Sequence, residues 1–279
     1  MKSVSCIIPL YGLTVGDNLR FFKELLVSVR QASQPFSGNY EVILVNDDRN
    51  RISEEDVLGW CHECRLSDRV KYIENEENGG QAYSRNIGAA HATYDYLHFV
   101  DQDDYISPDF YDPFLKAKEA SDFYISTPCF DKDGDKRPAY TPLLKGAYGC
   151  AKEISQLWYL LFSNIVYSPG QLVMSKASYE QAGGFPVLNH RGADDFALFY
   201  KLVFSGRRYT VSYMAKSKFY YRIHAQQNSK LSSTGVSACE FLGSQNTVGF
   251  KQRAICIQKS RKWAGWLGKL FYVLFFKRA

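Results

Sequence analysis

The first 120 residues of the chain alternate between short apolar runs and segments with helical periodicity. The apolar runs have the length and composition of buried strands, and they occupy residues 4–8, 41–45, 70–73 and 96–100. Helices are predicted for residues 18–30, with Asp17 as a candidate N-cap, for 80–92 and for 107–120. This alternation predicts an α/β fold with a mostly parallel sheet and helices on both of its faces.

Beyond residue 121 the pattern is looser, and short strands are predicted for 123–126 and 171–175. A helix is predicted for 195–205, closed by Gly206. Residues 131–150 are rich in Pro, Asp and Gly and are interpreted as a flexible loop. The second half of the chain therefore constrains the fold less than the first half.

Acidic residues crowd the end of the strand predicted for 96–100, which is followed by Asp101, Gln102, Asp103 and Asp104. Neighbouring carboxylates repel one another and lose hydration when they are buried, and a divalent cation relieves both effects. Oxygen ligands suit Mg²⁺ or Mn²⁺, which usually also bind substrate phosphates. The alternative is a solvated acidic turn without a ligand.

Unusual residues also follow the other predicted strands. Because the carboxyl ends of parallel strands meet at one crevice, these residues are expected to converge there. A nucleotide diphosphate in that crevice needs a ring surface, an acceptor for the base edge and a cation for its phosphates. Pro9 with Tyr11, Asp47 and Arg85 can supply these in that order, and Gly79 with Gly80 allows close approach of the backbone.

The charge of the chain is unevenly distributed. The formal net charge is +5, yet eight of the 34 Lys and Arg residues lie in 251–279, and no Asp or Glu follows Glu240. The rest of the chain is therefore slightly acidic. A nucleic-acid-binding protein more often spreads basic residues over its fold, so we expect no nucleic-acid partner.

The basic C-terminal tail, residues 231–279, has an aromatic face. Residues at helical spacing include Trp263, Trp266, Leu267, Leu270, Phe271 and Leu274. The uncharged run 270–276 is far shorter than the ~20 apolar residues of a membrane span. An amphipathic helix lying in the headgroups of an anionic membrane is predicted, and packing on the protein itself or on a partner subunit is the alternative.

The beginning of the chain and its cysteines bear on its location. The first predicted strand follows directly after Ser3, so no signal peptide is expected, and the seven cysteines are odd in number and irregular in spacing. Reduced thiols in the cytoplasm are therefore expected. With the tail, this predicts a peripheral protein on the inner face of the cytoplasmic membrane.

Taken together, the motifs resemble those of family-2 glycosyltransferases with the GT-A fold. The matching stretches are residues 5–11, 41–48, 78–80, 84–88, 99–104, 183–185, 194–206 and 221–224. The resemblance covers about residues 3–230 and suggests an enzyme of the bacterial surface-polysaccharide type. It implies a Rossmann-like sheet flanked by helices, with a nucleotide-sugar-binding half (1–120), a smaller acceptor half (121–230) and the C-terminal tail.

The resemblance also implies an activity and its residues. An inverting transferase would move a sugar from a nucleotide-sugar donor, commonly a UDP-sugar, to a hydroxyl of a saccharide or lipid-linked saccharide. Asp195 would be the general base. The donor would contact Pro9, Tyr11, Asp47, Gly80, Arg85, Asp101, Gln102 and Arg222, and Mn²⁺ or Mg²⁺ would be held by Asp101, Asp103 and His224.

This chain departs from the family pattern at several positions. Asn46 stands in place of the first Asp of the usual Val-Asp-Asp, and Asp48-Arg49 in place of Gly-Ser, which affects recognition of the base. Asp194 stands where Glu usually precedes the catalytic base. We take Asp194 as the capping residue of the helix that follows.

Other interpretations stay open at this stage. A nucleotidyltransferase would also pair a metal with carboxylates, but it more often has a Gly-rich, basic loop after its first strand, where this chain has residues 9–12. A non-catalytic sugar-nucleotide-binding protein would not need Asp195 near Asp101. Arg85 can be a solvated helix residue, and His224 a core histidine bonded to the backbone.

Overall fold

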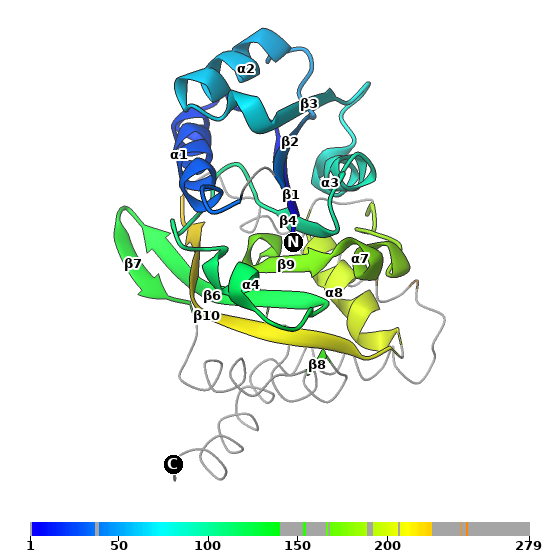
Figure 1. Ribbon diagram of the computed structural model, residues 1–279. Helices are drawn as coiled ribbons and strands as arrows, with labels where there is room; N and C mark the ends of the chain where they lie inside the picture. Colours follow the sequence, from blue (N-terminus) through cyan, green and yellow to red (C-terminus); the bar gives the residue numbers. More distant parts are fainter. Residues whose placement is uncertain are drawn as a thin grey trace.

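The computed structural model describes residues 2–36, 39–139, 153–154, 166, 168–188, 192–205, 207–224, 241 and 244 (Figure 1). Its strands are β1 Val4–Leu10, β2 Tyr40–Asn46, β3 Val70–Glu74, β4 Tyr96–Phe99, β5 Tyr105–Ile106, β6 Phe123–Lys132, β7 Asp135–Pro138, β8 Glu153–Ile154, β9 Leu172–Ser175 and β10 Tyr209–Arg222. Its α-helices are α1 Asn18–Ala32, α2 Glu54–Glu63, α3 Gly80–Ala90, α4 Asp112–Lys116, α7 Lys176–Gln181 and α8 Asp194–Phe204.

The described strands form one sheet with the order β3-β2-β1-β4-β9-β6-β10-β5, and β7 and β8 pair at the side with β6 and β10. The first four strands are parallel, as predicted. In the other half, β9 runs antiparallel to both β4 and β6, so this part of the sheet is mixed. The strand order reverses between β1 and β4, which is where open α/β sheets bind ligands.

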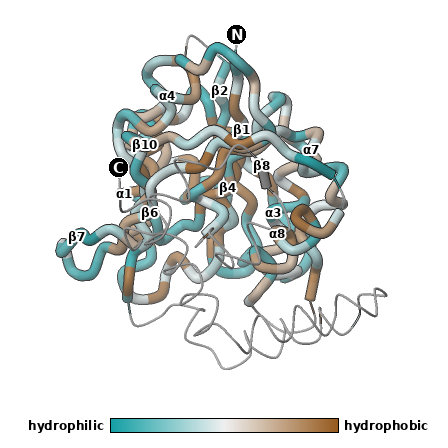
Figure 2. The backbone as a smooth tube through the Cα atoms, turned by 90° about the horizontal axis from the view of Figure 1, so that it is seen from below, coloured by the Kyte–Doolittle hydropathy of each residue, from teal (hydrophilic) through white to brown (hydrophobic). Residues whose placement is uncertain are grey.

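Helices cover both faces of the parallel half. In Figure 1, α1 and α2 lie on one side of β1 and β2, and α3 lies on the other. Alternate residues of β2 divide between two cores, because Val42 and Leu44 pack with α1 while Ile43 and Val45 pack with α3 and α8. Figure 2 shows the apolar residues concentrated in the central strands and polar residues in the β7 hairpin.

Pro9 does not end the first strand, which the sequence placed at residues 4–8. It pairs with Val45 of β2 inside β1. Val100 donates its N–H to the Ile7 carbonyl, and Asp47 donates to the Leu10 carbonyl, so Ile7 faces β4 and Leu10 faces β2. The backbone nitrogen of Pro9 therefore faces the side of β4, beyond the last residue of that strand. The N–H that proline lacks would not have formed a hydrogen bond between strands there.

The helix predicted for 107–120 is reduced to α4, Asp112–Lys116. Ser107 was expected to cap it, but its backbone N–H donates to the Lys218 carbonyl and its Oγ accepts from the Lys218 N–H at 3.1 Å. Pairing with β10 thus uses the groups that a cap requires. Asp17 does precede α1, but its side chain makes no capping bond and pairs with Arg20.

The loop predicted for 131–150 is partly a β-hairpin. β6 continues to Lys132 and pairs antiparallel with β7 across a turn at Asp133 and Gly134. Both turn residues have positive φ, 53° and 87°, which suits the tight hairpin turns that asparagine, aspartate and glycine favour. Residues 140–150 lie outside the described part.

Among the helices that the structure describes, none is both long enough and apolar enough to cross a membrane. The amphipathic helix predicted in the C-terminal tail lies outside the described residues, as does Gly206, which was predicted to close α8.

Candidate active site

The acidic residues after β4 form a tight turn at the switch point of the sheet. The Asp104 N–H donates to the Asp101 carbonyl at 3.1 Å. Asp101 Oδ1 accepts hydrogen bonds from Arg85 Nη2 at 2.5 Å and Gln81 Nε2 at 2.7 Å. Asp103 Oδ2 lies 2.8 Å from His224 Nε2. The turn after β4 therefore contacts side chains of α3 and of His224, which follows β10.

Arg85 links the acidic turn to helix α8. Its side chain is 2% exposed, and its second guanidinium nitrogen, Nη1, pairs with Asp194 Oδ2. Burial disfavours the charged form, but Asp101 and Asp194 raise the pKa of the guanidinium above its usual value. Arg85 is thus a buried bridge between two carboxylates and not a solvated helix residue. A direct contact with a diphosphate stays a prediction.

Asp194 was expected to cap α8 and does not. Ala193, in the left-handed conformation at φ 66°, takes the N-cap position and provides no side-chain bond. Asp194 is the first residue of the helix and turns to Arg85 instead. Asp194 and Arg85 are 109 residues apart in the chain, so no local pattern predicts that they pair.

Asp195 follows at the second position of α8 and is partly exposed. Its Oδ1 accepts the Phe196 N–H at 2.6 Å, and its Oδ2 accepts no hydrogen bond from the described residues. Burial and the Asp194 carboxylate raise the pKa of Asp195 to about 7, and Asp101 adds to this effect. The carboxylate is therefore electrostatically linked to the acidic turn, and it has the proton affinity of a general base that works near neutral pH.

Asp47, predicted to bind the base, organises the loop before α3. Its Oδ1 accepts from Asn75 Nδ2 at 2.8 Å and from the Gly79 N–H at 2.9 Å, and its Oδ2 accepts from the Gly80 N–H at 2.8 Å. Gly80 has φ 82°, which explains why a glycine stands there. A carboxylate offers about four acceptor positions, so one remains for a ligand.

Asn46, the departure from the usual motif, is fully buried. Its Nδ2 donates to the Ile52 carbonyl and to Tyr72 Oη, and its Oδ1 accepts from the Asp48 N–H. The site needs both a donor and an acceptor, which an amide supplies and an ionised carboxylate does not.

A cavity of about 420 Å³ opens beside this loop. It is lined by Tyr11, Asp47–Arg51 and residues 75–78. Tyr11 is 41% exposed there. Gln102, predicted to contact the donor, turns its side-chain amide to the Tyr11 backbone. Pro9, also predicted to contact the donor, is buried in β1 and does not line this cavity.

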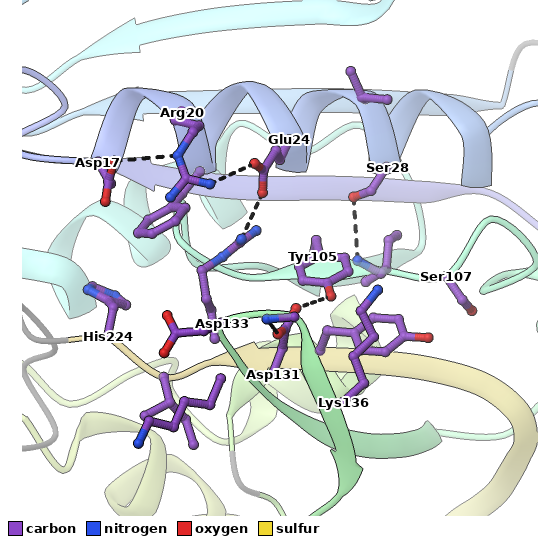
Figure 3. A pocket seen from close by; sticks show the side chains of 18 of the residues that line it. Asp17, Arg20, Glu24, Ser28, Tyr105, Ser107, Asp131, Asp133, Lys136 and His224 are labelled. Carbon is purple, nitrogen blue, oxygen red and sulfur yellow. Dashed lines mark hydrogen bonds and ion pairs between the residues drawn. The ribbon is translucent and has the colours of Figure 1, made fainter.

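A larger cavity of about 870 Å³ lies between α1 and the β6–β7 hairpin (Figure 3). His224 and Arg222 line it, and Asp195 lines neither cavity. Arg222 holds the acidic turn, because its N–H donates to Asp104 Oδ1 and its Nε to the Asp103 carbonyl. Its Nη1 pairs with Glu24 of α1 at 2.7 Å. A contact between Arg222 and a diphosphate stays a prediction.

The acidic turn has features that suit a divalent cation. Burial and the neighbouring Asp103 raise the pKa of Asp104 well above its usual range, and Asp104 Oδ2 is buried without a hydrogen-bond partner. Within the described ranges, no three His, Cys, Asp or Glu side chains are assembled as a complete metal site. Magnesium sites that bind nucleotides commonly use one or two carboxylates and take further ligands from phosphates and water. Asp101 and Asp103 are two carboxylates of this turn and His224 contacts Asp103, and a metal held by these three residues stays a prediction.

Sequence comparison identifies the family. The glycosyl transferase family 2 model matches residues 5–181, more than half of the chain, and the chain belongs to this family. An uncharacterized glycosyltransferase of Haemophilus influenzae is 35% identical over 106 residues, which are 38% of this chain and 31% of that protein. One of Rickettsia conorii is 27% identical over 133 residues, 48% of this chain and 20% of that protein. The chain thus matches only a minor part of these relatives.

Solved structures confirm the fold. The crystal structure of S. aureus TarS 1–349 in complex with UDP-GlcNAc has a TM-score of 0.62 and 21% sequence identity, and the match covers 86% of this chain and 64% of that one. TarS 1–349 in complex with UDP matches with a TM-score of 0.59 and 21% identity, over 86% of this chain and 63% of that one. The mixed α/β sheet flanked by helices is therefore the GT-A fold that the sequence predicted.

Proposed function

We propose that the chain transfers a sugar, with inversion, from a UDP-sugar to a hydroxyl of a saccharide or lipid-linked saccharide. The observation that carries this proposal is the position of Asp195 at the start of α8, beside Asp194, which Arg85 joins to Asp101 of the acidic turn. The family membership supports transfer, and the TarS complex with UDP-GlcNAc supports a uridine donor.

The chemistry follows from the arrangement of the side chains. The acceptor oxygen attacks the anomeric carbon as the bond to the diphosphate breaks, and Asp195 Oδ2 takes the hydroxyl proton. Asp101, Asp103 and His224 would hold Mn²⁺ or Mg²⁺, which neutralises charge on the departing diphosphate when bound. The Tyr11 ring and Asp47 would receive the base at the 420 Å³ cavity. Arg85 places a positive charge between the Asp101 and Asp194 carboxylates.

A nucleotidyltransferase is less consistent with this site. Such an enzyme needs no base at the position of Asp195, and the turn after β1 has no Lys or Arg between Pro9 and Gly16. A non-catalytic binding protein would leave the proton affinity of Asp195 without a role.

We also propose attachment to the cytoplasmic face of a membrane through residues 231–279.

The proposal is tested by thermal-shift measurements with UDP-sugars, GDP-sugars and ADP, each with and without Mn²⁺. A UDP-sugar with Mn²⁺ should raise the melting temperature most, because a ligand that binds only the folded state stabilises it. Hydrolysis or transfer of the sugar should then follow for the same donor. Stabilisation by ADP without any response to UDP-sugars would contradict the proposed donor.

The pH dependence of the reaction should report the proton affinity of Asp195. The base works when deprotonated, so with a pKa of about 7 we expect kcat/KM to fall about tenfold per pH unit below that value and to level off above it. Because the Asp194 carboxylate raises this pKa, Asp194→Asn should move the acid limb of the profile to lower pH. An acid limb near pH 4 in the unmodified protein would contradict the assignment of Asp195.

A further inference from the structure

The Tyr11 backbone is held by a side chain from the acidic turn. The Tyr11 N–H donates to Gln102 Oε1 at 2.8 Å, and Gln102 Nε2 donates to the Tyr11 carbonyl at 2.7 Å. The two residues are 91 positions apart in the chain. One amide thus satisfies both polar backbone groups of the first residue after β1.

The next residue is held in the same way. Asp48 Oδ2 accepts the Gly12 N–H at 2.9 Å, and Asn18 Nδ2 donates to the Gly12 carbonyl at 2.9 Å. Gly12 has φ 62°, so the chain turns sharply there. Side chains from three different segments therefore fix the Tyr11–Gly12 segment, beyond the point where sheet pairing ends.

We propose that Gln102 is a positioning residue for nucleobase recognition. It holds Tyr11 at the rim of the 420 Å³ cavity and so connects the base end of the donor site to the acidic turn. This inference rests on the proposed function. Gln102 lies between Asp101 and Asp103 in the acidic turn. A ligand that orders this turn therefore also orders Tyr11, whose ring is the proposed surface for the base. By linkage, the base and the groups bound at the turn then strengthen each other's binding.

The choice of residue fits this role. A glutamine amide presents one donor and one acceptor side by side, which matches the N–H and C=O of one residue. Gln102→Met keeps the length of the side chain and removes both hydrogen bonds. Gln102→Glu keeps the acceptor and replaces the donor with an oxygen that repels the Tyr11 carbonyl.

The clamp itself is tested without a ligand, by hydrogen exchange of the Tyr11 amide. Exchange should accelerate in Gln102→Met by about tenfold or more, because the Tyr11 amide loses the Gln102 Oε1 acceptor. Gln34→Met, at an exposed glutamine beyond the C-terminal end of α1, is the matched control and should leave it unchanged. An unchanged Tyr11 amide in Gln102→Met would overturn the clamp.

The role in base recognition is tested by binding of UDP and of inorganic pyrophosphate, each with Mn²⁺. Gln102→Met should weaken UDP binding about tenfold, as expected for the loss of one or two hydrogen bonds, and leave pyrophosphate binding within about twofold. If Gln102 acts through Tyr11, Gln102→Met should have no further effect on UDP binding in a Tyr11→Ala background.

The outcomes separate this inference from the proposed function. Equal losses of affinity for UDP and pyrophosphate would show that Gln102 acts on the diphosphate. Additive losses in the double variant would show that Gln102 does not act through Tyr11. Either result would overturn the inference alone. A folded, unmodified protein that binds pyrophosphate but not UDP would overturn the proposed uridine donor. Should Gln102→Met fail to fold, Gln102→Leu gives the same comparisons, because it also lacks both hydrogen-bonding groups without adding a charge.

Discussion

Asp195→Asn is expected to lower kcat by roughly 10²–10⁴-fold, the usual contribution of a positioned general base. The amide keeps the size and the hydrogen-bond acceptor of the side chain but cannot take the proton of the acceptor hydroxyl. Binding of the donor should change little, because the residues proposed to hold it lie on other elements. Steady-state transfer rates and calorimetric donor affinity, measured on the same preparation, check both parts.

The stability of this variant separates catalysis from folding. Since the pKa of Asp195 is raised on folding, to about 7, ionisation above that pH favours the unfolded state. A neutral Asn removes this effect, so the melting temperature at pH 8 should be equal or higher. Asp112→Asn, the same change in the first turn of α4, is the matched control and should keep full activity. Normal turnover by Asp195→Asn would exclude Asp195 as the base.

Arg85→Met is expected to lower the free energy of unfolding by about 3–5 kcal/mol, the range found when one partner of a buried ion pair is removed. The guanidinium is 2% exposed and separates two carboxylates, from Asp101 and Asp194. Without it, these carboxylates face each other without a counter-charge. Chemical denaturation at pH 8, where both are ionised in water, measures the loss.

A surface arginine provides the control for this prediction. Arg20 also bridges two carboxylates, from Asp17 and Glu24, but its side chain is 58% exposed and water screens the interaction. Arg20→Met should therefore leave the denaturation midpoint almost unchanged. Adding Asp194→Asn to Arg85→Met should recover part of the lost stability, because one of the two facing charges is removed. A loss in Arg85→Met as small as that in Arg20→Met would contradict the bridge.

The parallel half of the fold could be predicted because its information is local. Buried strands such as 41–45 are continuous apolar runs, and 18–30 carries an apolar face at helical spacing. The ends of these elements depend on pairing between distant segments, so they were predicted less accurately. Pro9 stays in β1 because β4 ends early, and Ser107 bonds to β10 instead of starting a helix.

The sequence predicted which residues belong to the candidate site better than it predicted which of them contact each other. The sequence placed Asp101, Asp103 and His224 in one site; in the structure His224 contacts Asp103, while Asp101 pairs with Arg85, and a shared metal stays a prediction. It did not predict that Asp194 would pair with Arg85 or that Gln102 would hold Tyr11. A buried charge needs a partner of opposite charge. The sequence placed Arg85 in a predicted helix, but a helical pattern does not indicate which distant carboxylate pairs with it.

The sequence alone determined the order of strands and helices, the acidic turn at the end of a buried strand and the family resemblance. All of these depend on residues close together in the chain. Only the tertiary structure decided which carboxylates share Arg85, how Asp195 obtains its proton affinity and where the Gln102 amide points. These depend on burial and on distances between residues that are far apart in the chain, and no local pattern records either quantity.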